Sequence, residues 1–351
     1  MDRYLLRQIA LFFVMLLLIL TGLAWMLQIL SMLKILIQYN VSIGGFMGLT
    51  TMLIPYIMTL IIPFAIFIAT MFVYNRMISD REITVMMGAG LSPARIAHSA
   101  FLLTGVITAV HLLFNLWLVP ASQNNFYTKQ WEIRYGLAHL ALQESSFNRL
   151  ADDMVVFVDR VNDKDMSNLM LFDNRNPKNQ IIAVAQRGKL IATNRGMSLV
   201  MDHGSIQSMG DAFVVGTFDT FDMDMNISDN RAENAFRARR ISSPALIKSV
   251  SMPTIFSETE YKSLIAEVAN RFLMPLMDII LVLIASIVLL KSSLLRRKMS
   301  IAPAIATIAM TGAMALFMTI SGVITSVSAL IALAAGQIIT IICLIMALIK
   351  K

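Results

Sequence analysis

Long apolar runs alternate with short polar segments along this chain, a pattern typical of a protein that crosses a membrane several times. Nearly uncharged runs cover 9–33, 46–74, 99–119, 272–290, 301–320 and 325–349. Each run is close to the roughly 20 residues that a helix needs to cross the hydrocarbon core of a bilayer. The pattern therefore predicts six transmembrane helices, with a long polar insert between the third and the fourth.

The distribution of charge assigns the two sides of the membrane. The formal net charge is +7, but residues 121–271 carry 17 Lys and Arg against 18 Asp and Glu, so the excess belongs to the membrane part. Eleven of the twelve cations in that part fall on one side of a six-helix topology, and Lys34 is the exception. Because cytoplasmic loops are enriched in Lys and Arg, we expect both termini in the cytoplasm and the insert outside. The basic excess reflects membrane orientation, so nucleic acid is not an expected partner.

A short polar helix is expected at 79–88, between the second and third spans. Ser79 and Glu82 have the spacing of a capping box, in which each side chain binds the backbone amide of the other residue. Gly90 supplies the left-handed conformation that ends a helix, and Ser92 followed by Pro93 begins the next one. A capped helix at the membrane surface favours a contact with another protein, and an interfacial connector is the alternative.

The insert changes character between 150 and 228, where turn residues separate short apolar strands. Strands are expected at 154–161, 168–172, 180–186, 189–193, 198–201, 205–209 and 213–227. Such strands are typical of an all-β sandwich or roll. Phe221, Met223 and Met225 alternate with acidic residues, so they are expected on one apolar face, with Phe157 in the same interior. Flexible methionines suit acyl chains, although ordinary core packing is the better supported explanation for them.

The sequence contains no catalytic, metal-binding or nucleotide-binding motif. Its four histidines have no metal-ligand spacing, and Gly188-Lys189 lacks the remaining residues of a phosphate-binding loop. We therefore expect no enzyme activity, no metal and no cofactor. If transport requires a nucleotide site, that site must be on another chain.

Ionisable residues at membrane depth are candidates for function because a charge is costly there. Lys34 lies at the outer end of the first span, where it either binds an anionic substrate or extends to a lipid headgroup. If Lys34 binds the substrate, its helical neighbours Leu23, Leu27 and Leu30 would line an acyl-chain cavity.

The fourth span also carries ionisable residues. Arg271 occupies the level that corresponds to Lys34, with Glu267 one turn away as its expected ion-pair partner. Asp278 lies about 10 Å deeper, since seven residues separate it from Arg271. We expect Asp278 to pair with a basic group on a neighbouring span, or to lie close enough to the surface to be hydrated.

Three groups of residues carry a resemblance to a known family. They are Asp80 to Met86, which reads Asp-Arg-Glu-Ile-Thr-Val-Met and precedes Gly88-Ala89-Gly90-Leu91-Ser92; Arg3-Tyr4-Leu5 with Arg7; and Glu267 with Asn270-Arg271 and Pro275-Leu276. Together, around a β-rich insert, they make the chain similar to the lipopolysaccharide export permease family, LptF/LptG or YjgP/YjgQ. The first group is more similar to LptF than to LptG.

The resemblance implies a multi-pass, non-catalytic transport subunit of the Gram-negative inner membrane. Helices 1 to 3 with the coupling helix 79–88 would occupy 1–120, a periplasmic β-jellyroll with its linkers 121–266, and helices 4 to 6 267–351. The implied partners are lipopolysaccharide, a homologous LptG-like permease, a dimer of LptB-like cytoplasmic ATPases and an LptC-like periplasmic bridge.

The resemblance also implies roles for single residues. The helix between the second and third spans would dock in a groove of the ATPase with Glu82 as its acidic anchor, and we expect Ile83, Met86 and Met87 to form the apolar docking face. The candidate ATPase contacts are Asp80, Arg81, Glu82, Ile83, Met86, Met87 and Gly90. The candidate lipid contacts are Lys34, Leu23, Leu27, Leu30, Arg271, Phe157, Phe221, Met223 and Met225.

Two other functional classes stay open. An ABC-type mechanotransmission or lipoprotein-release subunit also couples a motor to a periplasmic domain, but usually with four spans. A membrane-anchored periplasmic sensor or scaffold needs no ATPase, so co-purification would distinguish it.

Overall fold

The computed structural model describes residues 2–38, 42–136, 144–151, 153–162, 165–175, 180–193, 196–209, 213–224, 238–252, 256–292 and 301–350. The chain divides into two compact units. The membrane unit comprises 1–31, 47–126 and 230–351, and the sheet unit comprises 32–46 and 127–229.

Six helical segments of the described chain are long and apolar enough to cross a membrane, which confirms the predicted number. They are α1 (Asp2–Gln38), α3 (Ile54–Ser79), α5 (Pro93–Leu113) continued through the π-helix η1 (Phe114–Leu118) into α6 (Val119–Gly136), α10 (Glu258–Ser292), α11 (Ala302–Val323) and α12 (Val327–Ile349). The shorter helices are α2 (Ile43–Thr51), α4 (Glu82–Gly88) and α9 (Ser243–Val250). Ser326 separates the last two spans, because its hydroxyl accepts the amide of Ala329 and caps α12.

Helix α10 is the central element of the membrane unit. Its apolar side chains belong to one cluster with α1, α3 and α5 and to a second cluster with α3 and α11. Most of α10 is therefore buried, whereas few residues of α12 are buried in the single chain.

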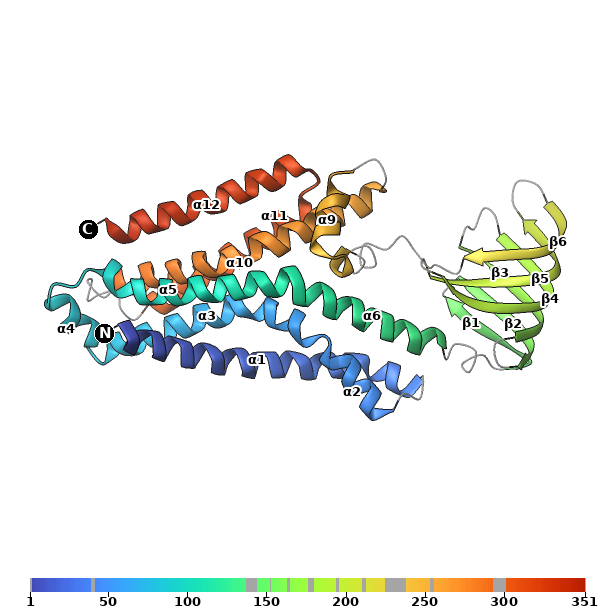
Figure 1. Ribbon diagram of the computed structural model, residues 1–351, viewed down its shortest axis with the longest axis horizontal. Coiled ribbons are helices and arrows are strands. Elements are labelled where there is room, and N and C mark those ends of the chain that lie inside the picture. Colours follow the sequence, from blue (N-terminus) through green and yellow to red (C-terminus); the bar gives the residue numbers. More distant parts are fainter. Residues whose placement is uncertain are drawn as a thin grey trace. The chain divides into compact units, whose positions relative to one another are not determined.

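Both ends of the chain lie at the same end of the membrane unit as α4 (Figure 1). Arg95, at the start of α5, forms an ion pair of 3.0 Å with Asp2 of α1. Lys291, at the end of α10, donates to the carbonyl of Lys350 at 2.8 Å. These contacts place both termini at the α4 end of the helices, and the cytoplasmic location of that end stays a prediction.

The sheet unit contains six antiparallel strands in the order β1-β2-β3-β4-β5-β6. They are β1 (Ser146–Ala151), β2 (Met154–Asn162), β3 (Asp165–Asp173), β4 (Gln180–Thr193), β5 (Gly196–Met209) and β6 (Phe213–Asp224). The sequence does not predict β1, which has no clear apolar alternation. The predicted strands also break β4 at 187–188 and β5 at 202–204, where His203-Gly204 resembles a turn, but both strands are continuous. Gly204 instead allows close packing, since a Cβ there would lie 2.2 Å from the Val184 carbonyl oxygen.

The sheet rolls on itself and buries its inner face. Met154 of β2, Leu199 of β5 and Met223 of β6 share one core cluster. After β3, the guanidinium of Arg175 binds the Asp173 carboxylate at 2.7 Å and contacts the Met223 sulfur at 3.3 Å. The described strands thus form a roll from a single meander, whereas a jelly roll has two sheets with Greek-key connections.

Two of the predicted interior residues are confirmed and one is wrong. Phe221 and Met223 belong to the inner core. Phe157 lies on the outer face, because its register neighbours there are Phe147 and Met170, which are both exposed. Strand alternation fixes this outcome, since the adjacent β2 positions fill the interior. Met225 lies outside the described residues.

Candidate substrate site and coupling helix

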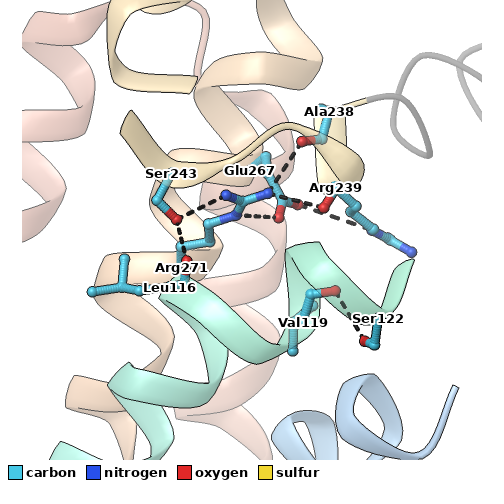
Figure 2. Close-up of polar contacts among 8 residues, drawn as sticks. All are labelled: Leu116, Val119, Ser122, Ala238, Arg239, Ser243, Glu267 and Arg271. Carbon is cyan, nitrogen blue, oxygen red and sulfur yellow. Dashed lines mark hydrogen bonds and ion pairs between the residues drawn. The ribbon is translucent and has the colours of Figure 1, made fainter. Parts of the chain in front are cut away.

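Arg271 of α10 is the centre of a buried polar cluster in the membrane unit (Figure 2). Its Nε donates to Glu267 Oε1 at 2.8 Å, which confirms the predicted ion pair. Its Nη2 donates to the carbonyls of Ala238 and Arg239 at 3.2 and 3.0 Å, and its Nη1 donates to Ser243 Oγ at 3.0 Å. Four of the five guanidinium N–H groups are therefore engaged.

The same cluster reaches the π-helix η1. Ser243 Oγ accepts from Arg271 and donates to the carbonyl of Leu116 at 2.7 Å (Figure 2). Single π-helical turns inside α-helices are rare and frequently occur at functional sites. Arg271 and Ser243 thus connect three separate parts of the chain: α10, η1 and the segment that begins at Ala238.

A cavity of about 270 Å³ opens beside this cluster, lined by residues of α3, η1, α10 and α11. Tyr56, Asn115, Asn270 and Arg239 supply much of its polar lining. The Arg239 guanidinium lies 4.9 Å from the centroid of the Tyr56 ring and 3.9 Å from the Glu267 carboxylate. The cavity therefore offers amides, a phenol and a partly exposed guanidinium, which suit hydroxyl and phosphate oxygens.

The geometry of Arg271 favours internal support over the predicted contact with substrate. Its side chain is 2% exposed, and an incoming anion would have to displace Glu267. Arg239, with 27% of its side chain exposed, is better placed to meet a ligand in the cavity. The sequence does not single out Arg239, because this residue lies in a basic linker without a membrane pattern.

Helix α4 begins at Glu82, so the predicted Ser79–Glu82 capping box is wrong. Ser79 is the last residue of α3, and its hydroxyl donates to the carbonyl of Asn75 at 3.0 Å. The N-cap of α4 is Arg81, which has the left-handed φ of 60° and makes no side-chain cap. A side chain at the end of one helix can bind its own last turn, and here that bond replaces the capping box.

The connection from α4 to α5 agrees with the prediction. Gly90 has a φ of +89°, in the left-handed region that favours glycine. Ser92 Oγ then accepts the amide of Arg95 at 3.3 Å and caps α5. Asp80, Arg81 and Gly90 are all exposed.

The predicted apolar docking face of α4 is wrong, because those side chains pack inside the chain. Ile83 is fully buried in the cluster of α1, α3 and α5, and Met86 and Met87 pack against the same cluster. Thr84 and Val85 lie on the exposed side, where Val85 is 70% exposed. A partner of α4 would therefore meet Val85 and its neighbours, not Ile83.

Three of the predicted lipid contacts form one exposed stripe on α1. Leu23, Leu27 and Leu30 are spaced at i, i+4 and i+7, and each is more than half exposed in the single chain. The stripe is available for lipid or for another chain. Lys34 belongs to α1, but its side chain lies outside the described part of the structure.

Asp278 pairs with a neighbouring span, which confirms one of the two expectations for it. Its Oδ2 lies 2.9 Å from Nδ1 of His111 on α5. The sequence does not identify His111 as the partner, because nothing in the spacing of the four histidines separates it from the others. No group of three or more His, Cys, Asp or Glu suited to a metal ion occurs among the described residues.

The sequence is similar to a known protein family and to individual proteins. A family model described as "Lipopolysaccharide export system permease LptF/LptG" matches residues 3–350. The chain is 22% identical over 282 residues to an uncharacterized protein of Rickettsia prowazekii (strain Madrid E). This aligned region covers 77% of this chain and 76% of that protein. It is 26% identical over 154 residues to the lipopolysaccharide export system permease protein LptF of Escherichia coli (strain K12). This aligned region covers 42% of this chain and 41% of that protein.

Proposed function

Because the chain belongs to the lipopolysaccharide export system permease LptF/LptG family, we propose that it extracts lipopolysaccharide from the outer leaflet of the inner membrane. Both termini and α4 would lie in the cytoplasm. A permease of this family transports and does not catalyse, so the energy would come from a separate LptB-like ATPase dimer. An LptG-like permease and an LptC-like periplasmic bridge complete the proposed assembly.

The position and the exposed side of helix α4 support the proposed contact with the ATPase. It is a separate short helix at the same end of the bundle as both termini, and its inner side is anchored by Ile83. Its outer side, with Val85, is exposed, and Gly90 and Ser92 connect it directly to α5. A force applied to α4 would therefore act on the start of a transmembrane helix. We propose that the ATPase contacts Thr84 and Val85, with Glu82 at their edge.

Substrate recognition is proposed to use two surfaces of the membrane unit. The stripe of Leu23, Leu27 and Leu30 is apolar and suits acyl chains. The cavity beside Arg239 and Asn270 is polar and suits the hydroxyl or phosphate groups of a lipid headgroup.

The sheet unit is proposed to hand the lipid on to the bridge through a free edge. Within the described sheet, β1 pairs only with β2, and β6 pairs only with β5. An unpaired edge strand can accept a strand from another chain. Met223 is 7% exposed, so the interior would have to open before acyl chains could contact Phe221 and Met223.

Photo-crosslinking tests the proposed substrate. A photoreactive amino acid at Leu27 should capture lipopolysaccharide in cells, because that side chain is 68% exposed on the proposed lipid-binding stripe. The matched control is Ile342 on α12, which is 50% exposed and belongs to no proposed substrate surface. Capture of phospholipid alone at both positions would contradict the proposal, because Leu27 would then face the ordinary bilayer.

A further inference from the structure

The pair formed by His111 of α5 and Asp278 of α10 has no role in the function proposed so far. Its Nδ1 and Oδ2 atoms are 2.9 Å apart, and both side chains are fully buried. Within the described residues, the other imidazole nitrogen, Nε2, and the other carboxylate oxygen, Oδ1, have no hydrogen-bond partner. The pair is therefore the one strong polar contact that either side chain makes there.

The pair lies within the hydrocarbon layer. The nearest charged residues of α10 are Arg271 and Lys291, which are seven and thirteen residues away, or about 10 and 20 Å along the helix. Together these distances span the roughly 30 Å of a bilayer core. Other titratable residues of the helices that pack on α10 are Tyr56, Tyr74 and Arg76 of α3, Arg95 and His98 of α5, Lys248 of α9 and Cys343 of α12. None of them forms an ion pair or hydrogen bond with His111 or Asp278.

Charge favours a neutral pair. An ionised Asp278 beside a neutral His111 would leave a net negative charge in hydrocarbon, which is strongly unfavourable. One additional proton removes the net charge, whether it is on the imidazole or on the carboxyl. In either case a hydrogen bond joins Nδ1 to Oδ2, and separating the helices would leave both groups unsatisfied.

We propose that His111 and Asp278 are positioning residues, an inference that rests on the proposed function. As a neutral hydrogen-bonded pair they fix α5 to α10, so that a movement of α4 caused by the ATPase is passed on to α10. Helix α5 begins four residues after Ala89, the C-cap of α4. His111 lies three residues before the π-helix, whose Leu116 carbonyl is held by Ser243.

The pair adds a directional interaction to the contact between α5 and α10. That contact is mostly apolar, with side chains of both helices in one cluster. Apolar burial is non-directional, so it specifies the relative position of two helices less closely than a hydrogen bond does. A buried hydrogen bond has a fixed length and direction, and it therefore fixes the position of the two helices.

The test measures lipopolysaccharide molecules released for each ATP hydrolysed by the reconstituted full complex. In the variant H111L/D278L both polar groups are gone, so no buried charge remains and the chain should still fold. We expect its ATP hydrolysis to persist, while lipid release for each ATP falls about threefold or more. D278N keeps a hydrogen bond to His111 and should stay close to the wild-type ratio. T104V is the matched control, because Thr104 is buried on α5 and bonds only within its own helix.

A wild-type ratio in H111L/D278L would overturn the proposal, and so would an equal loss in D278N. If H111L/D278L does not assemble, H111Q/D278N decides, since it replaces the pair with two neutral amides. A wild-type ratio for that variant supports the proposal, and a threefold loss contradicts it. Failure of the proposed function would look different, because the unmodified complex would then release no lipopolysaccharide with ATP.

Discussion

Replacement of Arg271 by Met tests whether the buried cluster holds the outer part of the membrane unit together. The variant R271M keeps an apolar side chain of similar length but removes all four hydrogen bonds. Glu267 would remain buried, and its remaining ion-pair partner among the described residues would be Arg239, at 3.9 Å. Loss of one partner from a buried ion pair costs about 3 to 5 kcal/mol. We therefore expect the free energy of unfolding to fall by that amount.

Equilibrium denaturation of the purified protein in mixed micelles measures this change. The double variant E267Q/R271M should recover part of the loss, because no buried carboxylate remains, although the Ala238 and Arg239 carbonyls lose the hydrogen bonds from Arg271. The matched control is K262M on the same helix, since Lys262 and Glu258 form an exposed i, i+4 pair of 2.6 Å. That exposed pair should contribute far less to stability than the buried Glu267–Arg271 pair. The reasoning fails if R271M is no less stable than K262M.

Three further predictions concern α4 and the sheet unit. V85D should weaken ATPase binding at least about tenfold in a pull-down titration without unfolding the chain, because Val85 is exposed and apolar; unchanged binding would exclude this face. G204A should destabilise the roll, because a Cβ at Gly204 meets Val184 and Phe218. G216A should not, because the nearest atom to a Cβ there is 3.7 Å away. Equal amide exchange in both variants would contradict this. Burial alone would raise the pKa of the Asp173 carboxyl, but the hydrogen bonds and charge of Arg175 hold that pKa below its usual value. The Asp173 pair should therefore stabilise the roll at neutral pH and stop doing so as the pH falls from about 4 through the lowered pKa, and D173N should remove this dependence in amide exchange of the full chain.

Sequence patterns within one helix or one strand are sufficient to predict much of this fold. The six spans follow from apolar length, and the caps at Ser92 and Ser257 follow from local side-chain chemistry. Ser257 and Glu260 have the spacing of a capping box at the start of α10, and Ser257 N donates to Glu260 Oε2 at 3.1 Å. The Glu267–Arg271 pair was predictable for the same reason, since both residues lie on one helix face one turn apart.

Features that depend on contacts between distant segments were not predictable. The partner of Asp278 is 167 residues away in the chain, and no local pattern identifies His111. The docking face of α4 was wrong because helical periodicity groups Ile83 with Met86 but does not say whether that group faces a partner or the chain's own core. The outer position of Phe157 depends on strand register, which long-range pairing sets.

The most direct test of the central claim is the location of lipopolysaccharide after the chain is depleted in its own bacterium. Newly made, radiolabelled lipopolysaccharide would be measured in separated inner and outer membranes, with phospholipid as the internal control. The account predicts that lipopolysaccharide accumulates in the inner membrane while phospholipid distribution stays normal. An unchanged flow of lipopolysaccharide to the outer membrane would contradict it.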